Sequence, residues 1–199
     1  MSNVKLAVIY YSSTGTNFQT AKAVAEGGEL AGAEVRLRKV EELAPDAAID
    51  SNPLWRANVN AMADVPVVSL DDLEWADAVI LGAPTRFGNM ASQMKQFIDT
   101  TGGLWFQGKL ANKVAAAFTS SQNEHGGQEA ALLSLQTTFY HWGCIIVPPG
   151  YTDDAVFANG GNPYGVSTNS ITDTDIPDTA KAAAKHLAQR VVQVAGWIS

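Results

Sequence analysis

Short apolar segments alternate with longer amphipathic segments along most of the chain. The apolar segments are rich in Val, Ile, Leu and Ala and predict β-strands at residues 4–11, 34–39, 77–83, 113–119 and 144–148. Between and after them, apolar residues recur at helical spacing, which predicts helices at 16–30, 90–100, 129–142 and 178–194 and a short helical turn at 70–76. Strands and helices that alternate in this way form a parallel sheet covered by helices on both faces. We therefore expect an α/β fold with a doubly wound, five-stranded parallel sheet.

Three segments refine this architecture. In the second strand, Val35 and Leu37 alternate with charged side chains, which is typical of a strand at the edge of a sheet. Residues 44–67 and 149–176 have mixed, turn-rich compositions and no clear period, so both are expected to be long irregular tracts. The chain shows no internal repeat and no linker. Residues 1–199 are therefore interpreted as a single domain.

The composition narrows the possible functions. The net charge is −7 and no cluster of Lys and Arg offsets it, which argues against a nucleic-acid partner. No apolar run approaches the ~20 residues of a membrane-spanning helix, so no membrane span is expected. The N-terminal apolar run is also too short for a signal peptide. Cys144 is the only cysteine, which excludes an internal disulfide, favours a cytoplasmic location and, next to an apolar strand, indicates a structural thiol.

The turn between the first strand and the first helix carries candidate phosphate-binding chemistry. It offers hydroxyl side chains, a glycine that allows close approach of the backbone, and the free N–H groups of a helix N-terminus. The turn lacks the lysine of a P-loop and the three glycines of a Rossmann fingerprint. An ordinary helix cap is the alternative, because Ser and Thr are common at helix starts. The candidate residues are Ser12, Ser13, Thr14, Gly15, Thr16 and Asn17.

Two further loops follow predicted strands. The loop at 84–89 combines a hydroxyl, a guanidinium, an aromatic ring and an amide, and the loop at 119–128 is rich in hydrogen-bond donors. A strand order of 2-1-3-4-5 would bring both loops together with the first turn at the carboxyl edge of the sheet, where ligands bind. This mixture suits a planar ring such as isoalloxazine or nicotinamide. The candidate residues are Pro84, Thr85, Arg86, Phe87, Gly88, Asn89, Ser120, Ser121, Gln122, Asn123 and Gly126.

Several motifs resemble one known family. They read YYSSTG, GAPTRFGNM, TGGLW, GGQE, IVPPGY and PYG, at residues 10–15, 82–90, 101–105, 126–129, 146–151 and 163–165. These motifs resemble the flavodoxin-like NAD(P)H:quinone oxidoreductases of the WrbA type, and the similarity extends over residues 4–198. The segment around residues 84–90 is the most specific of them.

This resemblance implies a flavodoxin-like fold, FMN as a non-covalent cofactor, NADH or NADPH as hydride donor and a quinone as substrate. Residues 12–17 would hold the FMN phosphate, residues 84–89 would run along the isoalloxazine, and residues 120–126 would contact the ring and the ribityl chain. Trp105 corresponds to a lid residue beside the flavin or quinone, and Thr14 stands at a position that touches the nicotinamide. Family members are typically homotetramers in which a neighbouring chain completes the active site.

The sequence departs from the family pattern in three places. Thr14 stands where many members have an aromatic residue or Met. The loop at 119–128 is one residue longer than in close relatives. Trp142 follows His141 where some members have two adjacent histidines, and His141 is interpreted as a helix-end residue near the last carbonyls.

The expected activity is two-electron reduction of quinones to quinols. NAD(P)H and the quinone would use one site in turn, which predicts ping-pong kinetics. A one-electron flavodoxin-type electron carrier is the alternative, and a non-enzymatic partner-binding protein is a third possibility.

Three side chains have candidate roles with open alternatives. His125 is a candidate proton donor, because an unperturbed imidazole titrates near pH ~6.5, or else a solvent-exposed loop residue. Arg86 is a candidate for offsetting charge on the reduced flavin, or else a member of a surface ion pair. Arg56 or Arg86 would serve a 2′-phosphate if the fold places one of them beside it. No metal-binding set is predicted.

Overall fold

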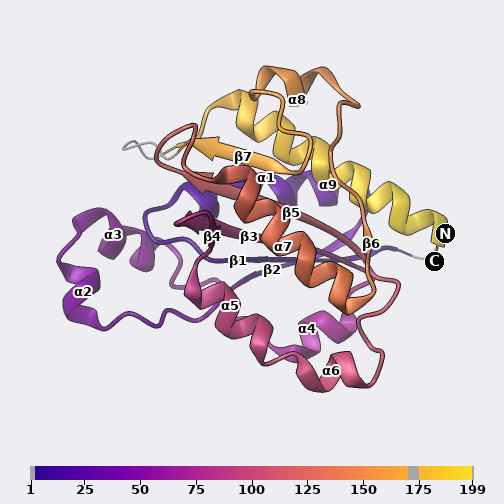
Figure 1. Cartoon of the computed structure of the whole chain (residues 1–199), viewed down its shortest axis with the longest axis horizontal. Helices are drawn as coiled ribbons and strands as arrows, with labels where there is room; N and C mark the ends of the chain where they lie inside the picture. Colours follow the sequence, from indigo (N-terminus) through magenta and orange to yellow (C-terminus); the bar gives the residue numbers. More distant parts are fainter. Residues whose placement is uncertain (1–2, 170–174, 199) are drawn as a thin grey trace.

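The computed structural model describes residues 3–169 and 175–198. A mainly parallel sheet lies between two layers of helices (Figure 1). None of the described helices combines the length and the apolar character that crossing a membrane requires. The elements are β1 (Lys5–Tyr10), α1 (Thr16–Leu30), β2 (Glu34–Lys39), α2 (Asp46–Asp50), α3 (Pro53–Ala61), α4 (Leu70–Trp75), β3 (Ala78–Arg86), β4 (Asn89–Met90), α5 (Ser92–Asp99), α6 (Gly102–Phe106), β5 (Val114–Ser121), α7 (Gln128–Trp142), β6 (Ile145–Ile146), α8 (Asp154–Ala158), β7 (Val166–Asn169) and α9 (Asp178–Ile198).

The central strands follow the order β2-β1-β3-β5-β6, so the expected doubly wound sheet with the order 2-1-3-4-5 is confirmed. Neighbouring strands of this path are parallel, and Val8 of β1 lies opposite Leu37 of β2 and Ile80 of β3. β2 lies at the edge of the sheet, as its alternating pattern predicts. Because the strands are parallel, their carboxyl ends share one edge of the sheet.

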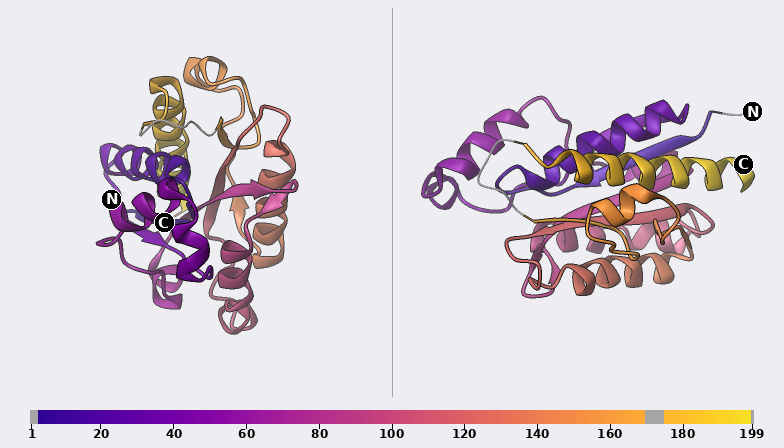
Figure 2. Two further views of the ribbon diagram at one scale, coloured as in Figure 1. Left: turned by 90° about the vertical axis from the view of Figure 1, so that its left-hand side faces the viewer. Right: turned by 90° about the horizontal axis from the view of Figure 1, so that it is seen from above.

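Helices cover both faces of the sheet (Figure 2), and a hydrophobic core lies on each face. On one face, Val24 of α1 and Leu187 of α9 pack against strand residues such as Val8. On the other face, α4, α5, α6 and α7 contribute residues such as Met94 and Leu135. Successive residues of β1 and β3 point to opposite cores, which explains why these strands read as continuous apolar runs.

The tract at 44–67 is not irregular, contrary to expectation, because it contains α2 and α3. These helices lie beyond the carboxyl edge of the sheet (Figure 1). Asn52 caps α3, and its side chain accepts hydrogen bonds from the N–H groups of Leu54 and Trp55. Pro53 occupies the first turn, where its missing N–H is not needed. The mixed composition of the tract concealed this helix start.

The tract at 149–176 also contains regular structure, while residues 170–174 lie outside the described residues. It includes α8 and β7, so the expectation of an irregular tract is wrong for this part. β6 pairs with β5 opposite Val114, and β7 pairs with β5 opposite Phe118. Two short strands therefore share the fifth position of the sheet, and the strand expected at 144–148 is shorter than predicted.

Two predicted loops are partly regular. β3 continues to Arg86 and returns as β4, so the loop expected at 84–89 is a β-hairpin. β5 likewise extends to Ser121. The segment 101–108, expected to be a loop between glycines, contains α6, where Leu104 is buried in the second core and holds the short helix against the sheet layer.

Candidate functional site

A cavity of about 630 Å³ lies at the carboxyl ends of β1, β3 and β5. Three segments converge on it: the turn after β1, the β3–β4 hairpin, and the end of β5 with the loop that follows. These are the three segments that the sequence predicts to bind a cofactor. The lining residues are Ser12, Ser13, Thr14, Thr16, Asn17, Asn52, Leu54, Pro84, Thr85, Arg86, Phe87, Ser120, Ser121, Gln122, Asn123 and Gly126.

The lining differs from the predicted cofactor set at five positions. Gly15, Gly88 and Asn89 belong to the same segments but do not line the cavity. Asn52 and Leu54 line it from the start of α3, and neither was predicted, because the tract at 44–67 was expected to be irregular. The Asn-Pro pair at 52–53 is the sequence signal that could have located them.

The turn after β1 has a conformation that requires glycine. Gly15 has φ +107° at the N-cap of α1, in a region that side chains with a Cβ disfavour. Its N–H donates to Ser12 Oγ over 3.2 Å, and its carbonyl accepts the N–H of Gln19 over 2.9 Å. Among the residues that the structure describes, no side chain caps this helix end. The first helical turn therefore keeps N–H groups for a ligand, together with the positive end of the helix dipole.

Two polar side chains at the start of α1 are buried. Thr16 is 5% exposed and Asn17 is 1% exposed. Among the described residues, none forms a hydrogen bond with the Thr16 hydroxyl or with either end of the Asn17 amide. Leaving a buried polar group unsatisfied costs ~1–3 kcal/mol. These orphaned groups, inside a cavity at a helix N-terminus, fit a ligand that carries a phosphate and further hydroxyl groups.

The β3–β4 hairpin ends in a two-residue turn. Arg86 pairs with Asn89 across the hairpin, and Phe87 and Gly88 between them have φ values of +53° and +78°. Positive φ at both central positions matches a type I′ turn, which fits the twist of a hairpin. Phe87 adopts this conformation despite its Cβ, and its ring is fully exposed at the cavity rim. Such a conformation is a local strain of the kind found at binding sites.

The hairpin packs closely against the loop after β5. The Thr85 hydroxyl donates to the Gly126 carbonyl over 3.3 Å. A Cβ on Gly127 would lie 2.7 Å from the Cα of Gly88, so the two backbones meet at a distance that excludes a side chain. Gln128 closes the loop by donating to Ser121 Oγ over 2.8 Å. These contacts hold two walls of the cavity in a fixed relation.

Arg86 links the hairpin to the first turn. Its guanidinium donates to Ser13 Oγ and to the Thr85 carbonyl, both over 3.1 Å. Within the described residues it forms no ion pair, so the alternative of a surface ion pair is not observed for this side chain. Arg86 therefore places a positive charge at the cavity rim.

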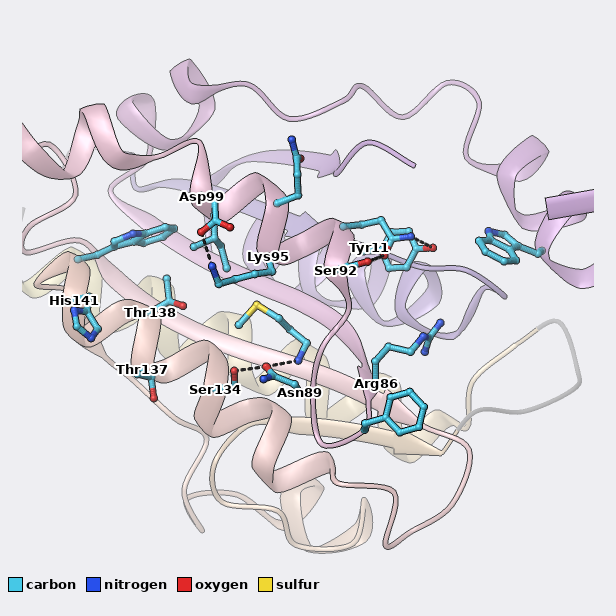
Figure 3. A pocket seen from close by; sticks show the side chains of 17 residues that line it. Tyr11, Arg86, Asn89, Ser92, Lys95, Asp99, Ser134, Thr137, Thr138 and His141 are labelled. Carbon is cyan, nitrogen blue, oxygen red and sulfur yellow. Dashed lines mark hydrogen bonds and ion pairs between the residues drawn. The ribbon is translucent and has the colours of Figure 1, made fainter. Parts of the chain in front are cut away.

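A groove of about 1040 Å³ adjoins the cavity and shares Arg86 and Phe87 with it. It runs between α5 and α7, and Figure 3 shows Lys95 and Asp99 on one side and Ser134, Thr138 and His141 on the other. Lys95 and Asp99 form an ion pair across one turn of α5. The end of the groove near the cavity is formed by aromatic and polar residues that include Tyr11, Trp55 and Gln93.

One carboxylate organises this end of the groove. Glu42 Oε2 accepts hydrogen bonds from the Tyr11 hydroxyl over 2.9 Å and from Trp55 Nε1 over 3.0 Å, and Glu42 Oε1 accepts from Gln93 Nε2 over 2.9 Å. Burial, together with the negative charge of Glu42, raises the pKa of Tyr11 above its ordinary value. Tyr11 is therefore a neutral donor throughout the physiological pH range.

Comparisons with known proteins agree with this geometry. The model of the NADPH-dependent FMN reductase family matches residues 4–155. The chain belongs to this family. It is 51% identical over 191 residues to a protein named NAD(P)H dehydrogenase (quinone) from Deinococcus radiodurans, covering 96% of this chain and 95% of that protein. A protein of the same name from Geotalea daltonii is 42% identical over 199 residues, covering 96% and 97%.

A solved structure shares the fold. The crystal structure of a flavodoxin, WrbA-like protein from Agrobacterium tumefaciens superposes with a TM-score of 0.72, covering 99% of this chain and 100% of that chain at 24% identity. This likeness confirms the expected flavodoxin-like fold. At the level of the family, the expected enzyme class and the expected cofactors, FMN with NADH or NADPH, are also confirmed.

Trp105 lies away from the predicted cofactor-binding segments of its own chain. It lies on α6, is half-exposed, and donates from Nε1 to the His141 carbonyl over 2.9 Å. His141 is in the last turn of α7, whereas Gln128 at the start of α7 lies beside the cavity. A 15-residue helix spans about 20 Å at 1.5 Å per residue. Trp105 is therefore far from the cavity of its own chain.

His125, Arg56 and Cys144 do not line the cavity. His125 is exposed, in line with the solvent-exposed alternative. Arg56 donates to Asp46 and to Asp50, each over 2.6 Å, and is not a lining residue of the cavity or the groove. Burial raises the pKa of the Cys144 thiol to about 12, which makes it a poor nucleophile and supports a structural role.

Proposed function

We propose that this protein is an FMN-dependent NAD(P)H:quinone oxidoreductase of the WrbA type that reduces quinones by two electrons. The observation that carries the proposal is the pair of buried side chains, Thr16 and Asn17, which have no partner among the described residues and lie at a helix start inside the cavity. The identity of up to 51% to proteins named NAD(P)H dehydrogenase (quinone) supports the same activity. A free thiol at Cys144 suits a reducing compartment such as the cytoplasm.

The cavity residues divide by their chemistry. The turn at 12–17 would hold the FMN phosphate through its hydroxyls and the N–H groups of α1. The hairpin at 84–89 and the segment at 120–126 would hold the ring and the ribityl chain through hydrogen-bond donors and acceptors. Arg86 and Ser13 would close the rim between phosphate and ring, because their side chains are hydrogen bonded to each other.

The groove next to the cavity is the proposed entry for NAD(P)H and the quinone. Thr14 and Phe87 line the cavity and are accessible from outside it, so both can contact a substrate. The Tyr11 hydroxyl and the Trp55 ring would form the polar and aromatic wall of this entry. Because one opening serves both reactants, they would exclude each other, which predicts ping-pong kinetics.

When bound, FMN supplies a ring that takes up two electrons and a proton from NAD(P)H and passes them to a quinone, and solvent supplies the second proton of the quinol. The chain orients the reactants and contributes charge. The exposed guanidinium of Arg86 would balance negative charge that develops near the rim. The aromatic surfaces would limit access of water to the reacting groups.

A homotetramer is part of this proposal. Trp105, Phe106 and Tyr140 are large exposed side chains on α6 and α7, and such surfaces favour contact with another protein. A second copy that packs along the groove would bring its own Trp105 toward this cavity. This arrangement reconciles a lid role for Trp105 with its distance from the cavity of its own chain.

Anaerobic mixing tests the activity. FMN-loaded protein is mixed with NADH or NADPH and then with benzoquinone, while the flavin absorbance is followed. We expect full bleaching and then full recovery, with two electrons transferred per FMN, and parallel lines in double-reciprocal plots of steady-state rates. Absence of bleaching with both nucleotides would contradict the proposal and favour a one-electron carrier.

The substitution Trp105→Ala tests the lid role. We expect kcat/KM for benzoquinone to fall about tenfold, because truncating a central interface tryptophan costs ~1–2 kcal/mol, while FMN affinity stays the same. Trp197→Ala, which truncates an exposed tryptophan on α9 at the other face of the sheet, is the matched control. Unchanged steady-state kinetics of the Trp105 variant, measured beside the molar mass in solution, would count against the lid role.

A further inference from the structure

The helix α3 touches the back of the turn that faces the cavity. Asn58 of α3 is 6% exposed, and its Nδ2 donates to the Ser12 carbonyl over 2.8 Å and to the Ser13 carbonyl over 3.1 Å. Ser12 and Ser13 line the cavity, whereas Asn58 does not. One side-chain amide therefore holds two consecutive carbonyls from the side away from the cavity.

The planar peptide group links the direction of these two carbonyls to the direction of the N–H groups that follow them. In a planar trans peptide, the carbonyl and the N–H of the next residue point in opposite directions. Carbonyls of Ser12 and Ser13 that point to Asn58 leave the N–H groups of Ser13 and Thr14 pointing away from it. Ser13 and Thr14 line the cavity and Asn58 does not, which favours a direction of these N–H groups toward the cavity.

The remaining contacts of the turn are consistent with this orientation. Gly15, whose conformation only glycine adopts without strain, would place a Cβ 3.6 Å from Asn58 Oδ1, so the turn lies close to the amide. Asn58 Nδ2 also lies 3.7 Å from Met62 Sδ, and the Met62 carbonyl accepts from Lys39 Nζ over 2.6 Å. Met62, which the Asn58 amide contacts, is thus tied to the end of β2.

We infer that Asn58 is a positioning residue for anion binding, which holds the N–H groups of Ser13 and Thr14 toward the phosphate of FMN. The inference rests on the proposed function, since it concerns the same cavity. It adds a residue that is 46 positions away from Ser12 in the chain and does not touch the ligand. It also assigns a role to α3 that the local sequence does not reveal.

The phosphate group provides a specific test. Riboflavin has the same ring and ribityl chain as FMN but lacks the phosphate. If Asn58 acts through the donors of the turn, its loss weakens FMN binding and leaves riboflavin binding unchanged. If Asn58 only supports the fold, both flavins are affected alike.

The experiment compares Asn58→Leu with Asn60→Leu, which changes an exposed residue of the same helix. Leu is neutral and similar in shape to Asn, so it removes the donor without adding charge near the phosphate. Dissociation constants of FMN and riboflavin are measured on flavin-free protein by fluorescence titration. We expect FMN affinity of the Asn58 variant to fall about tenfold or more, as for loss of a well-placed hydrogen bond. Riboflavin affinity, and both affinities of the Asn60 variant, should stay within about twofold of the wild-type values.

Two results would overturn the inference alone: an unchanged FMN affinity, or an equal loss for FMN and riboflavin. A wild-type protein that does not prefer FMN over riboflavin would overturn the proposed function as well, so the two failures are distinguishable. If Asn58→Leu does not fold, Asn58→Ala replaces it, because Ala suits a helix and leaves room for water. The same criteria apply to that variant.

Discussion

The cavity and the groove share Arg86 and Phe87, but different kinds of chemical group form their walls. The cavity is walled by backbone turns and by short hydroxyl and amide side chains at the ends of three strands. The groove is walled mainly by side chains on the facing sides of α5 and α7 (Figure 3). The cavity holds orphaned polar atoms, whereas the end of the groove near it is organised by the fully bonded carboxylate of Glu42.

Because of this difference, the two sites depend on different structural features. A site made of backbone requires particular dihedral angles, so it is sensitive to residues that restrict them. A site made of helix faces depends on side-chain contacts and on whatever packs against it. Cofactor affinity and substrate turnover should therefore respond to different substitutions.

The largest expected effect concerns the backbone of the cavity. In Gly15→Val, a β-branched residue would be placed at φ +107°, which costs ~1–3 kcal/mol, and we expect FMN affinity to fall about 100-fold. Fluorescence titration measures the affinity. Gly32→Val is the control, because Gly32 also has a positive φ and lies just beyond the other end of α1. Equal losses of FMN affinity in both variants would show that the effect does not depend on strain in the turn that lines the cavity.

The next effect concerns the groove. In Glu42→Gln, Tyr11 and Trp55 lose a charged acceptor, and we expect KM for NAD(P)H or quinone to rise about fivefold while FMN affinity is unchanged. Steady-state kinetics and flavin titration measure the two quantities. Glu41→Gln changes the exposed neighbouring carboxylate and should change neither. A lower FMN affinity in the Glu42 variant would show that cavity and groove are not independent.

A smaller effect changes protein stability and FMN binding in opposite directions. In Asn17→Leu, both orphaned amide atoms are removed, so we expect the flavin-free protein to be more stable by about 1 kcal/mol and FMN to bind more weakly. Urea unfolding of the flavin-free protein measures the first change, and flavin titration measures the second. A variant that is less stable and binds FMN normally would mean that Asn17 serves the fold rather than the ligand.

The smallest effect is a pH dependence at Tyr11. Burial and the charge of Glu42 raise the pKa of Tyr11, so the folded state retains this proton more strongly than the unfolded state. The associated stability is present below the ordinary tyrosine pKa of about 10 and is lost as pH rises above it. Between pH 9 and 11, the free energy of unfolding of the wild type should fall by about 1 kcal/mol more than that of Tyr11→Phe. Equal slopes in the two proteins would contradict the raised pKa.

Much of the fold follows from local patterns. The helix at 16–30 and the strand at 34–39 have the predicted bounds, because apolar periodicity and a glycine after the helix are local signals. The three cavity segments were predictable because strand ends in a parallel sheet share one edge. The sequence therefore predicts that the turn at 12–17 and the segment at 84–89 belong to one site.

The missed features depend on contacts between distant residues. Asn58 donates to carbonyls about 45 positions away in the sequence, and Trp55 donates to Glu42 in the segment that follows β2. Neither contact leaves a periodic pattern in the sequence. The positive φ of Phe87 is equally invisible, because a phenylalanine before glycine has no required conformation. Trp105 was assigned a role by resemblance, and only the fold reveals that it lies far from its own cavity.

The split fifth strand has a consequence for aggregation. β6 has two residues and β7 has four, so the outer side of β5 presents no long uninterrupted strand that another molecule could extend. At the opposite edge, β2 carries Arg36 and Arg38, both paired with Asp72, and such charges discourage pairing by a further strand. Both margins of the sheet are thus poor templates for the growth of intermolecular β-structure, which leaves the helical faces as the surfaces on which copies of the chain can associate.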